Sequence, residues 1–439
     1  MVETIEEIDE EIDSEERKVI QAEEIIKRSD YCRRPIEYEN VLIVGDLELS
    51  ADKQFNPRII ERIIIKNSEI KGDVNFDLNF LKVVDFTGTF FRGYVSFKKT
   101  QFVENAQFSN ARFSKGVNFE NAKFGSEQNL PFLDSTQFEG VIFRGNCSFE
   151  NTKFIDNVSF NHSRFSKDCR ISFSDAKFNE DALFFDILFG VEENINFMRV
   201  KFNGKADFSF SGFAGNADFS DAEFKGDVNF YGLVLNTKLN KKLLLKGADF
   251  NRLRVKSWNS IKDELDCDGP AYLSLVKSFK MQEQFDNADD CYYDYREWRR
   301  KSNDISKEKR SNGSKLYDFV SYASCGYGVR PSFTLAWIFG SILGFAALYR
   351  IFDGISKSSP AEITMTALNN NTLLFTSAIA ETSPSFWECL YFSAHSFAGG
   401  TPVDLSPVGA WKYAAMFETV LGYLFLALFI VVLARKLIR

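Results

Sequence analysis

A single repeat constrains the fold of this chain more than any other feature. Phenylalanine recurs at spacings that alternate between five and six residues, from residue 86 to 124, from 138 to 165 and again from 197 to 230. Two residues before most of these Phe positions stands a small or β-branched residue, for example Ala106 or Val117. Residues i−2 and i lie on the same side of an extended strand, so each unit buries one small and one aromatic side chain. The chain must therefore turn a corner between units.

Such a repeat predicts a wound β-solenoid with stacked Phe columns. If four units close a coil of about 22 residues and coils stack at roughly 4.8 Å, residues 74–250 form a rod of about eight coils, or about 40 Å. This arrangement explains why 47 of the 439 residues are Phe. We expect the wider spacings at 124–132, 165–173 and 189–197 to be bulged corners.

The units resemble a known family. Ala106-Gln107-Phe108-Ser109-Asn110 is similar to the pentapeptide repeat in its Phe-centred form, and the resemblance implies a right-handed quadrilateral β-helix over residues 41–252. Some members of that family imitate DNA and bind topoisomerases, which gives one alternative function. DNA mimicry needs a strongly acidic face, whereas residues 85–235 hold 20 acidic and 16 basic residues, intermixed. The sequence therefore disfavours a DNA mimic.

The negative charge of the chain is concentrated at its N-terminus. Residues 1–30 contain twelve Asp or Glu and four Lys or Arg, a difference of −8 that equals the net charge of the whole chain. Ile5, Ile8 and Ile12 begin a heptad seam that predicts an amphipathic helix from about Glu3 to Lys27. This helix would either cap the next domain or self-associate as a coiled coil. An acidic N-terminus is not a signal peptide, so we expect it to remain in the cytoplasm.

The sequence offers no carrier for catalysis. Its seven cysteines are scattered without a C-x-x-C pair, as is typical of reduced structural thiols, and its only histidines are His162 and His395. There is no glycine phosphate loop, no Ser/His/Asp set and no basic region suited to nucleic acid. We therefore expect a protein that is not an enzyme, with no cofactor, no metal site and no nucleic-acid partner.

Helical periodicity replaces the repeat after residue 252. A helical hairpin and a charged linker are predicted over residues 260–312, and the hairpin resembles a single tetratricopeptide-like unit. Arg296, Arg299, Arg300 and Lys301 are expected to mark the inner face of a membrane. Residues 314–330 have an apolar face bordered by tyrosines, which suits a short helix lying in the membrane interface.

Two apolar segments predict membrane-spanning helices. Phe333–Tyr349 and Tyr413–Ala434 are each long enough to cross about 30 Å of hydrocarbon, although the buried hairpin of a soluble protein is an alternative. Lys and Arg predominate before the first segment and after the second, whereas residues 351–412 hold two Lys and five acidic residues. The positive-inside rule then gives a multi-pass protein of the cell membrane, with both termini and the solenoid in the cytoplasm. The run Asn369-Asn370-Asn371 indicates that residues 363–380 form an outer loop and not a third span.

Between these helices lies a predicted re-entrant pore loop. An amphipathic half-length helix at 384–397 precedes a segment broken by Gly and Pro, and non-helical backbone is tolerated at membrane depth only where it lines water. Tyr391-Phe392-Ser393, Phe397 and Asp404 align without a gap on the two-helix potassium-channel family, whose pore loop ends Thr-Val-Gly-Tyr-Gly-Asp. This resemblance covers residues 332–439. It implies a homo-oligomer, with a tetramer favoured, that conducts monovalent cations through a lipid bilayer.

The predicted selectivity filter departs from that family. Thr401 and Val403 replace the two family glycines, and β-branched residues resist the left-handed backbone angles that those glycines adopt. Pro402 also biases Thr401 toward an extended form. We therefore expect weak potassium selectivity, with a ring of Asp404 at the outer mouth unless Asp404 is a helix cap or a structural acid. The residues assigned to the filter are Ala398, Gly399, Gly400, Thr401, Pro402, Val403 and Asp404.

Other residues are predicted to support or gate the pore. His395, Ser396 and Phe397 form the end of the pore helix; His395 either pairs with Asp404, which would make conductance sensitive to mild acid, or simply packs there. Gly422 matches the family's hinge glycine and either bends the second helix or allows close helix packing. Glu418 is assigned to the outer mouth.

The sequence thus predicts a mixed fold with a cytoplasmic β-solenoid, a helical linker and a two-helix membrane pore domain at 331–439. The function that follows is an oligomeric, weakly selective cation channel whose gating is coupled to the solenoid. The alternative is a membrane-anchored pentapeptide-repeat scaffold that does not conduct.

Overall fold

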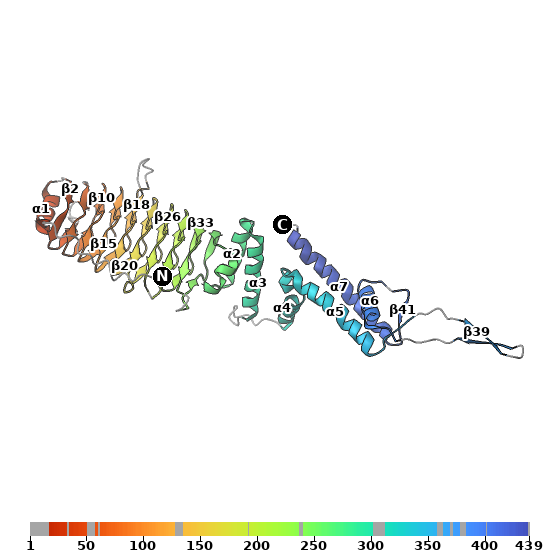
Figure 1. The fold of residues 1–439 in the computed structure, drawn as a ribbon. Helices are drawn as coiled ribbons and strands as arrows, with labels where there is room; N and C mark the ends of the chain where they lie inside the picture. The colour runs from red at the N-terminus through yellow and green to blue at the C-terminus, as the bar shows by residue number, and fades with distance from the viewer. Residues whose placement is uncertain are drawn as a thin grey trace. The chain divides into compact units, whose positions relative to one another are not determined.

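The fold is taken from a computed structural model, which describes residues 17–32, 35–50, 58–59, 62–127, 135–191, 193–236, 240–301, 312–357, 363–368, 372–377, 383–400 and 402–437. The chain forms two compact units, Met1–Tyr295 and Arg296–Arg439. Figure 1 shows that the first is a wound β-structure closed by helices and that the second is mainly helical.

The first unit is a solenoid built of short parallel strands. One face is a sheet of ten strands: β1 (Lys18–Gln21), β3 (Val41–Val44), β7 (Glu69–Ile70), β11 (Phe90–Phe91), β15 (Arg112–Phe113), β19 (Ile142–Phe143), β23 (Arg164–Phe165), β27 (Leu188–Phe189), β31 (Gly212–Phe213) and β34 (Val234–Leu235). A second face also has ten: β4 (Leu47–Ser50), β8 (Val74–Asp77), β12 (Tyr94–Ser96), β16 (Gly116–Asn118), β20 (Asn146–Ser148), β24 (Ile171–Ser172), β28 (Ile195–Asn196), β32 (Ala217–Asp218), β35 (Leu243–Leu244) and β37 (Leu265–Asp266).

The two remaining faces join into one sheet of 17 strands, because the last two coils cross the corner between them without a break. One of these faces contains β2 (Ile36–Glu39), β6 (Ile63–Lys66), β10 (Val84–Asp85), β14 (Ala106–Gln107), β18 (Thr136–Gln137), β22 (Val158–Ser159), β26 (Ala182–Leu183) and β30 (Ala206–Asp207). The other contains β5 (Arg58–Ile59), β9 (Asn79–Phe80), β13 (Gln101–Phe102), β17 (Lys123–Phe124), β21 (Lys153–Phe154), β25 (Lys177–Phe178) and β29 (Lys201–Phe202). The continuous strands β33 (Glu223–Asn229) and β36 (Asp249–Arg254) belong to both.

Phenylalanine fills the interior, as the repeat predicts. Phe138 and Phe160 of successive coils stack with their ring centroids 4.8 Å apart and their planes 3° from parallel, and both rings are fully buried. Eight strands, β8 to β35, form one face between residues 74 and 250, which confirms the predicted number of coils. The pairing of Phe165 with Phe189 advances the chain by 24 residues instead of 22, because the corner after Phe165 is longer.

The solenoid extends beyond its predicted limits of 41 and 252. Before residue 41 it includes β1 and β2, whose Ile20 and Ile36 enter the core in place of Phe, so the Phe spacing alone gave no sign of them. The last coil ends with β37, since Leu265 still pairs with Leu243 of the coil before it.

The N-terminal helix was predicted partly wrongly. Residues 18–21 form strand β1, which pairs in parallel with β3, and helix α1 (Ala22–Cys32) begins only after it. The reason is tertiary: Ile20 enters the core while Val19 stays 55% exposed, and β3 supplies backbone hydrogen bonds that a solitary segment lacks. The rest of the predicted helix lies outside the described residues.

Tight turns at one corner repeat in every coil. In the turn that starts at Phe86, the amide of Thr89 donates to the Phe86 carbonyl (3.0 Å), and the third residue, Gly88, has a φ of 66°. A positive φ at this position favours Gly or Asn. The same corner places Asn67, Asn110, Gly140, His162, Asp186, Phe210 and Gly232 at positive φ. Phe210, with φ 58° and 54% exposure, is the residue that fits this backbone least well.

Helices close the open edge of the last coil. The connection contains the short helices η3 (Trp258–Ser260) and η4 (Lys262–Glu264) and leads to α2 (Gly269–Met281) and α3 (Phe285–Lys301), which confirm the predicted hairpin. The hydroxyls of Ser274 and Ser278 accept hydrogen bonds from the amides of Phe250 and Leu253, each 2.7 Å long. These serines stand four residues apart and so share one face of α2.

The second unit contains two long apolar helices, α5 (Pro331–Ile351) and α7 (Trp411–Leu437). They follow α4 (Asn312–Cys325) and η5 (Gly326–Gly328), and between them lie β38 (Ile355–Lys357), the hairpin of β39 (Ile363–Leu368) and β40 (Thr372–Ser377), α6 (Phe386–Phe397) and β41 (Leu405–Pro407). Only 22% and 17% of the most apolar windows of α5 and α7 are buried inside the chain. A core hairpin of a soluble protein is mostly buried, so both helices are better suited to lipid or to other subunits.

Candidate pore segment

Helix α6 has well-defined ends that the sequence specifies locally. At its start, the amide of Ser385 donates to Oε2 of Glu388 (2.7 Å) and the Ser385 hydroxyl accepts from the Glu388 amide, which is a capping box. Lys357 of β38 adds an ion pair to Glu388 at 2.8 Å. These contacts fix the first turn of α6 beside the strand that follows α5.

The other end of α6 is stopped by glycine. Gly399 has a φ of 81°, the amide of Gly400 donates to the His395 carbonyl at 2.8 Å, and the amide of Gly399 donates to the Ser396 carbonyl at 3.1 Å. This is the Schellman arrangement, in which the residue after the helix cap adopts a left-handed backbone. The described structure therefore gives Gly399, assigned to the filter from the sequence, a role in ending the helix.

The helix packs between α5 and α7. Cys389 and Phe392 of α6 are buried in one cluster with Ala346 and Tyr349 of α5. On the opposite side, a Cβ atom added to Gly422 of α7 would collide with the Phe397 carbonyl oxygen and lie 2.8 Å from its carbon. Of the two roles considered for Gly422, close helix packing has this direct support, whereas hinge bending stays a prediction.

Glu418, assigned to the outer mouth from the sequence, is buried between helices of this chain, and its place in a pore stays a prediction. Its side chain is fully buried in the chain, where the hydroxyl of Tyr349 donates to Oε2 (2.8 Å) and Ser393 bonds to Oε1. Ser393 also donates to the Ile342 carbonyl at 2.8 Å. The sequence did not predict this burial, because helical periodicity along α7 does not tell which neighbour covers a given face.

His395 and Asp404 do not pair within this chain. Both belong to the described residues, and no hydrogen bond or ion pair joins them; His395 instead lies 4.7 Å from the Tyr391 ring, centroid to centroid. The simple packing of His395, the alternative considered above, is therefore what this chain shows. The hypothesis of a His395–Asp404 pair within one subunit is wrong.

The remaining filter residues differ in exposure. Pro402 is buried, Asp404 is exposed, and Val403 is 92% exposed. Asp404 precedes β41 and not a helix, and within the described residues it forms no ion pair, so neither alternative role proposed for it has support. Thr401 lies outside the described residues.

Sequence reasoning missed the polar contacts that tie these helices together. Tyr349 and Ser393 looked like ordinary members of apolar helices, and one polar residue on each of three helices was the only available signal. The sequence-based interpretation also treated Arg296 as a marker of the membrane face. In the structure, Arg296 forms an ion pair with Asp318 at 2.7 Å and lies over the Tyr327 ring. The side chains of Arg296 and Asp318 are only 15% and 9% exposed, so this is a structural ion pair.

The cysteines are structural thiols in the described part of the chain. Six of them are free and buried. Burial raises the pKa of Cys169 to about 12 and the pKa of Cys147 well above its usual range. Searched over the described residues, no cluster of three or more His, Cys, Asp or Glu side chains is arranged to hold a metal ion.

Comparison with known families identifies the first unit. The family model described as pentapeptide repeats (9 copies) matches residues 79–123 and 131–172, which are the most regular Phe-centred coils. The solenoid is a pentapeptide-repeat domain. Neither the comparison with curated proteins nor the comparison with solved structures gave a match. These findings give residues 332–439 no family, so the likeness to potassium channels stays a prediction.

Proposed function

We propose that this pentapeptide-repeat protein is one subunit of an oligomeric, weakly selective cation channel whose pore is formed around α6. One observation carries the proposal. Helix α6 is too short to cross a membrane and packs between α5 and α7, which are long enough. The C-terminal end of α6 contacts the middle of α7.

The depth of that end follows from helix geometry. At 1.5 Å per residue, the 12 residues of α6 span about 18 Å, well short of about 30 Å of hydrocarbon. Gly422, which contacts the end of α6, stands 11 residues after Trp411 at the start of α7, or roughly 16 Å along its axis. The chain therefore leaves its helical form near the middle of the bilayer.

Non-helical backbone at this depth needs water. Residues 398–400 and 402–403 follow α6 and include Gly399 with a left-handed backbone, so their amides and carbonyls cannot all be satisfied within a helix. One chain with two spanning helices does not enclose a water-filled path. Several copies around a shared axis provide one, and the resemblance to two-helix channels favours four.

The residues near this path favour cations. Asp404 is exposed just beyond the non-helical segment, and the C-terminal end of α6 carries the partial negative charge of a helix dipole. Pro402 and Val403 stand where potassium channels have tyrosine and glycine, which disfavours a narrow ladder of carbonyl sites. Weak selectivity between potassium and sodium follows.

The same proposal includes coupling to the solenoid. Helix α3 follows the helix that closes the last coil, and its Arg296 pairs with Asp318 of α4. Helix α4 exposes Leu316, Tyr317 and Phe319, which suits a position in the membrane interface. A change in the solenoid would then reach α5 through α3 and α4.

The test is the reversal potential of the purified protein in a planar bilayer, first under a potassium chloride gradient and then with potassium against sodium. We expect a potential close to that of the cation in the first case and close to zero in the second. Asp404→Asn is expected to lower the cation preference, while Lys177→Ala, an exposed change on the solenoid, serves as the control. Strong potassium selectivity would refute the filter argument, and absence of current under all conditions would favour the membrane-anchored scaffold.

A further inference from the structure

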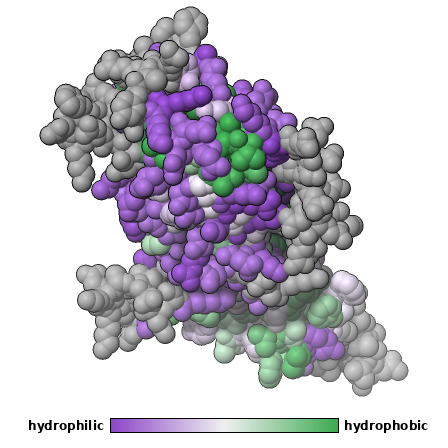
Figure 2. Space-filling view, turned by 90° about the vertical axis from the view of Figure 1, so that its left-hand side faces the viewer, coloured by the Kyte–Doolittle hydropathy of each residue, from purple (hydrophilic) through white to green (hydrophobic). Residues whose placement is uncertain are grey.

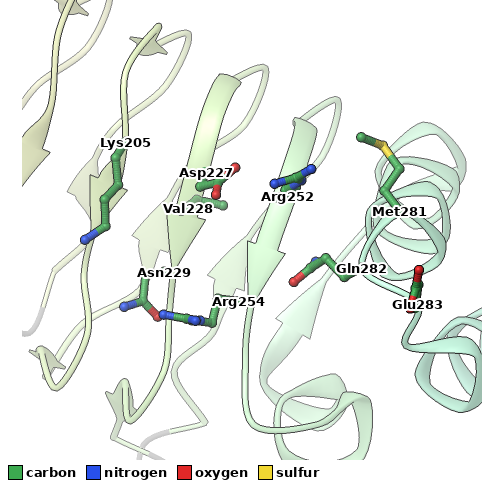
Figure 3. A pocket seen from close by; sticks show the side chains of 9 residues that line it. All are labelled: Lys205, Asp227, Val228, Asn229, Arg252, Arg254, Met281, Gln282 and Glu283. Atoms are coloured by element: carbon green, nitrogen blue, oxygen red, sulfur yellow. The ribbon is translucent and has the colours of Figure 1, made fainter.

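A groove lies at the C-terminal end of the solenoid (Figure 3). It encloses about 520 Å³, and all of its walls come from the first unit. The lining residues belong to β33, β36, the segment before β30 and the end of α2: Lys205, Asp227, Val228, Asn229, Arg252, Arg254, Met281, Gln282 and Glu283.

The groove exists because the last coil is one residue short at this corner. Three residues separate the buried Phe224 and Val228, whereas only two separate Phe250 and Leu253, and the register of β33 and β36 shifts at this point. The last coil therefore does not fully cover the coil before it, and Asp227 stays exposed.

The opposite wall is held firmly. The side-chain amide of Gln282 donates to the Leu253 carbonyl at 2.8 Å, so the end of α2 is tied to β36. The amide of Gln284 donates to the Phe279 carbonyl (2.9 Å), and Glu283 takes a left-handed backbone with a φ of 58°. Gly or Asn is usual at that position, so the backbone of Glu283 is strained. This strained residue places its carboxylate at the rim of the groove.

Two arginines on one strand supply positive charge to the groove. Arg252 and Arg254 alternate along β36, so they share a side of the strand and stand roughly 7 Å apart. Both are exposed, and neither side chain forms a hydrogen bond or ion pair with any other residue that the structure describes. Lys205 is different, because it is paired with Asp207 at 2.6 Å. Figure 3 shows Arg252 between Asp227 and the end of α2, and Arg254 beside Asn229.

We propose that this groove binds a small phosphorylated sugar or nucleotide. Guanidinium groups bind phosphate oxygens in pairs, which matches Arg252 and Arg254. The carboxylates of Asp227 and Glu283 accept hydrogen bonds from hydroxyl groups, and they disfavour a ligand that is anionic throughout. The volume lies within the usual range of small-molecule sites, about 300–1,000 Å³.

The site goes beyond the proposed channel function and does not depend on it. A ligand that bridges β36 and the end of α2 would hold the helical cap against the last coil, which is where the solenoid passes into α3. Binding is measured without current, so failure of this inference and failure of the pore proposal are distinguishable.

The test is isothermal titration calorimetry of the full chain in detergent with glucose 6-phosphate, AMP and inorganic phosphate. We expect saturable binding of at least one ester, at least tenfold weakening in the double variant Arg252→Ala/Arg254→Ala, and unchanged affinity in Arg164→Ala. Arg164 is a matched control, since it is an exposed arginine on another face. Circular dichroism confirms that each variant folds.

A second variant separates the two parts of the ligand. Asp227→Asn is expected to weaken the ester, because it removes a carboxylate that accepts from the sugar hydroxyls. It is not expected to weaken inorganic phosphate, because it also removes a negative charge from the groove. No saturable binding at millimolar concentration, or equal affinity in the double variant and in Arg164→Ala, overturns the site. Inorganic phosphate binding as tightly as the esters overturns the ligand class.

Discussion

Single residues decide how closely the helices of the second unit approach. Gly422 lets the backbone of α6 lie directly against α7, and Glu418, one turn before it, is bonded to one hydroxyl on α5 and another on α6. The polar contacts occur in a part of the chain whose other neighbours are apolar, so each lost partner leaves a group unsatisfied. The position of the non-helical segment therefore depends on a few atoms.

Gly422→Ala is expected to lower the stability of the second unit by about 1–3 kcal/mol, because the new methyl group overlaps the Phe397 carbonyl. Gly344→Ala on α5 is the control, since nothing lies within 4 Å of its added Cβ and alanine favours the helix. The melting temperatures of the two variants in detergent give the comparison. Equal melting temperatures would contradict the packing role.

Glu418→Ala is expected to destabilise the unit by about 1–3 kcal/mol, because it removes the acceptor of the buried Tyr349 hydroxyl and one of the two partners of the Ser393 hydroxyl. Glu418→Gln keeps both a donor and an acceptor and should stay close to the parent protein. The same melting experiment measures both. If Gln proves as damaging as Ala, the loss of these hydrogen bonds does not explain the effect of the Ala variant.

Phe210→Asn is expected to stabilise the solenoid by roughly 0.5–1 kcal/mol, because asparagine tolerates the left-handed backbone that Phe210 adopts at 58°. Phe185→Asn, at a neighbouring aromatic position of the same corner without a positive φ, is not expected to gain stability. Thermal unfolding followed by far-ultraviolet circular dichroism measures both. A loss of stability in both variants would show that the aromatic contacts stabilise this corner more than relief of the backbone strain at Phe210 does.

Strands and helices at the two ends of the solenoid cover its open strand edges. At the N-terminal end β1 and α1 complete the first coil, and at the other end α2 presents serine hydroxyls to the amides of β36. Unpaired strand edges otherwise invite pairing with other chains. Figure 2 looks onto the N-terminal side of the molecule, where hydrophilic residues surround a limited hydrophobic patch.

Ser278→Ala is expected to cost about 1–3 kcal/mol, because Ser278 is fully buried and its hydroxyl accepts from the Leu253 amide. Lys277→Ala, the exposed neighbour on α2, should have little effect. Hydrogen exchange at the Leu253 amide gives a local measurement beside the melting temperature. Unchanged protection of that amide would exclude the capping role.

At the scale of the whole molecule, a pentapeptide-repeat domain and a helical region with two long apolar helices share one chain. The first is polar outside with a continuous Phe core, and the second leaves large apolar side chains such as Trp337, Phe339 and Ile430 exposed. Under the proposed function, the first surface would face water and the second would face lipid or further subunits.

Protease protection tests the predicted topology. In inverted membrane vesicles we expect added protease to digest the solenoid, whereas in right-side-out vesicles the solenoid should be protected, because the basic residues that flank α5 and α7 stay on the cytoplasmic side. Detergent-opened vesicles control for intrinsic resistance. Digestion in right-side-out vesicles alone would show that the orientation is opposite to the predicted one. Digestion in both preparations would show that the solenoid has no fixed side of the membrane.

The sequence by itself determined the features that repeat or that depend on neighbouring residues. The Phe spacing predicted the coils, and the apolar lengths and end signals predicted α2, α5, α6 and α7 to within a few residues, because strand and helix periods are local properties. The tertiary structure alone decided that residues 18–21 pair as a strand, that Glu418 is buried, that His395 turns to Tyr391 and that a missing residue opens a groove. Each of these depends on which distant segment covers a given face, and no local pattern records that choice.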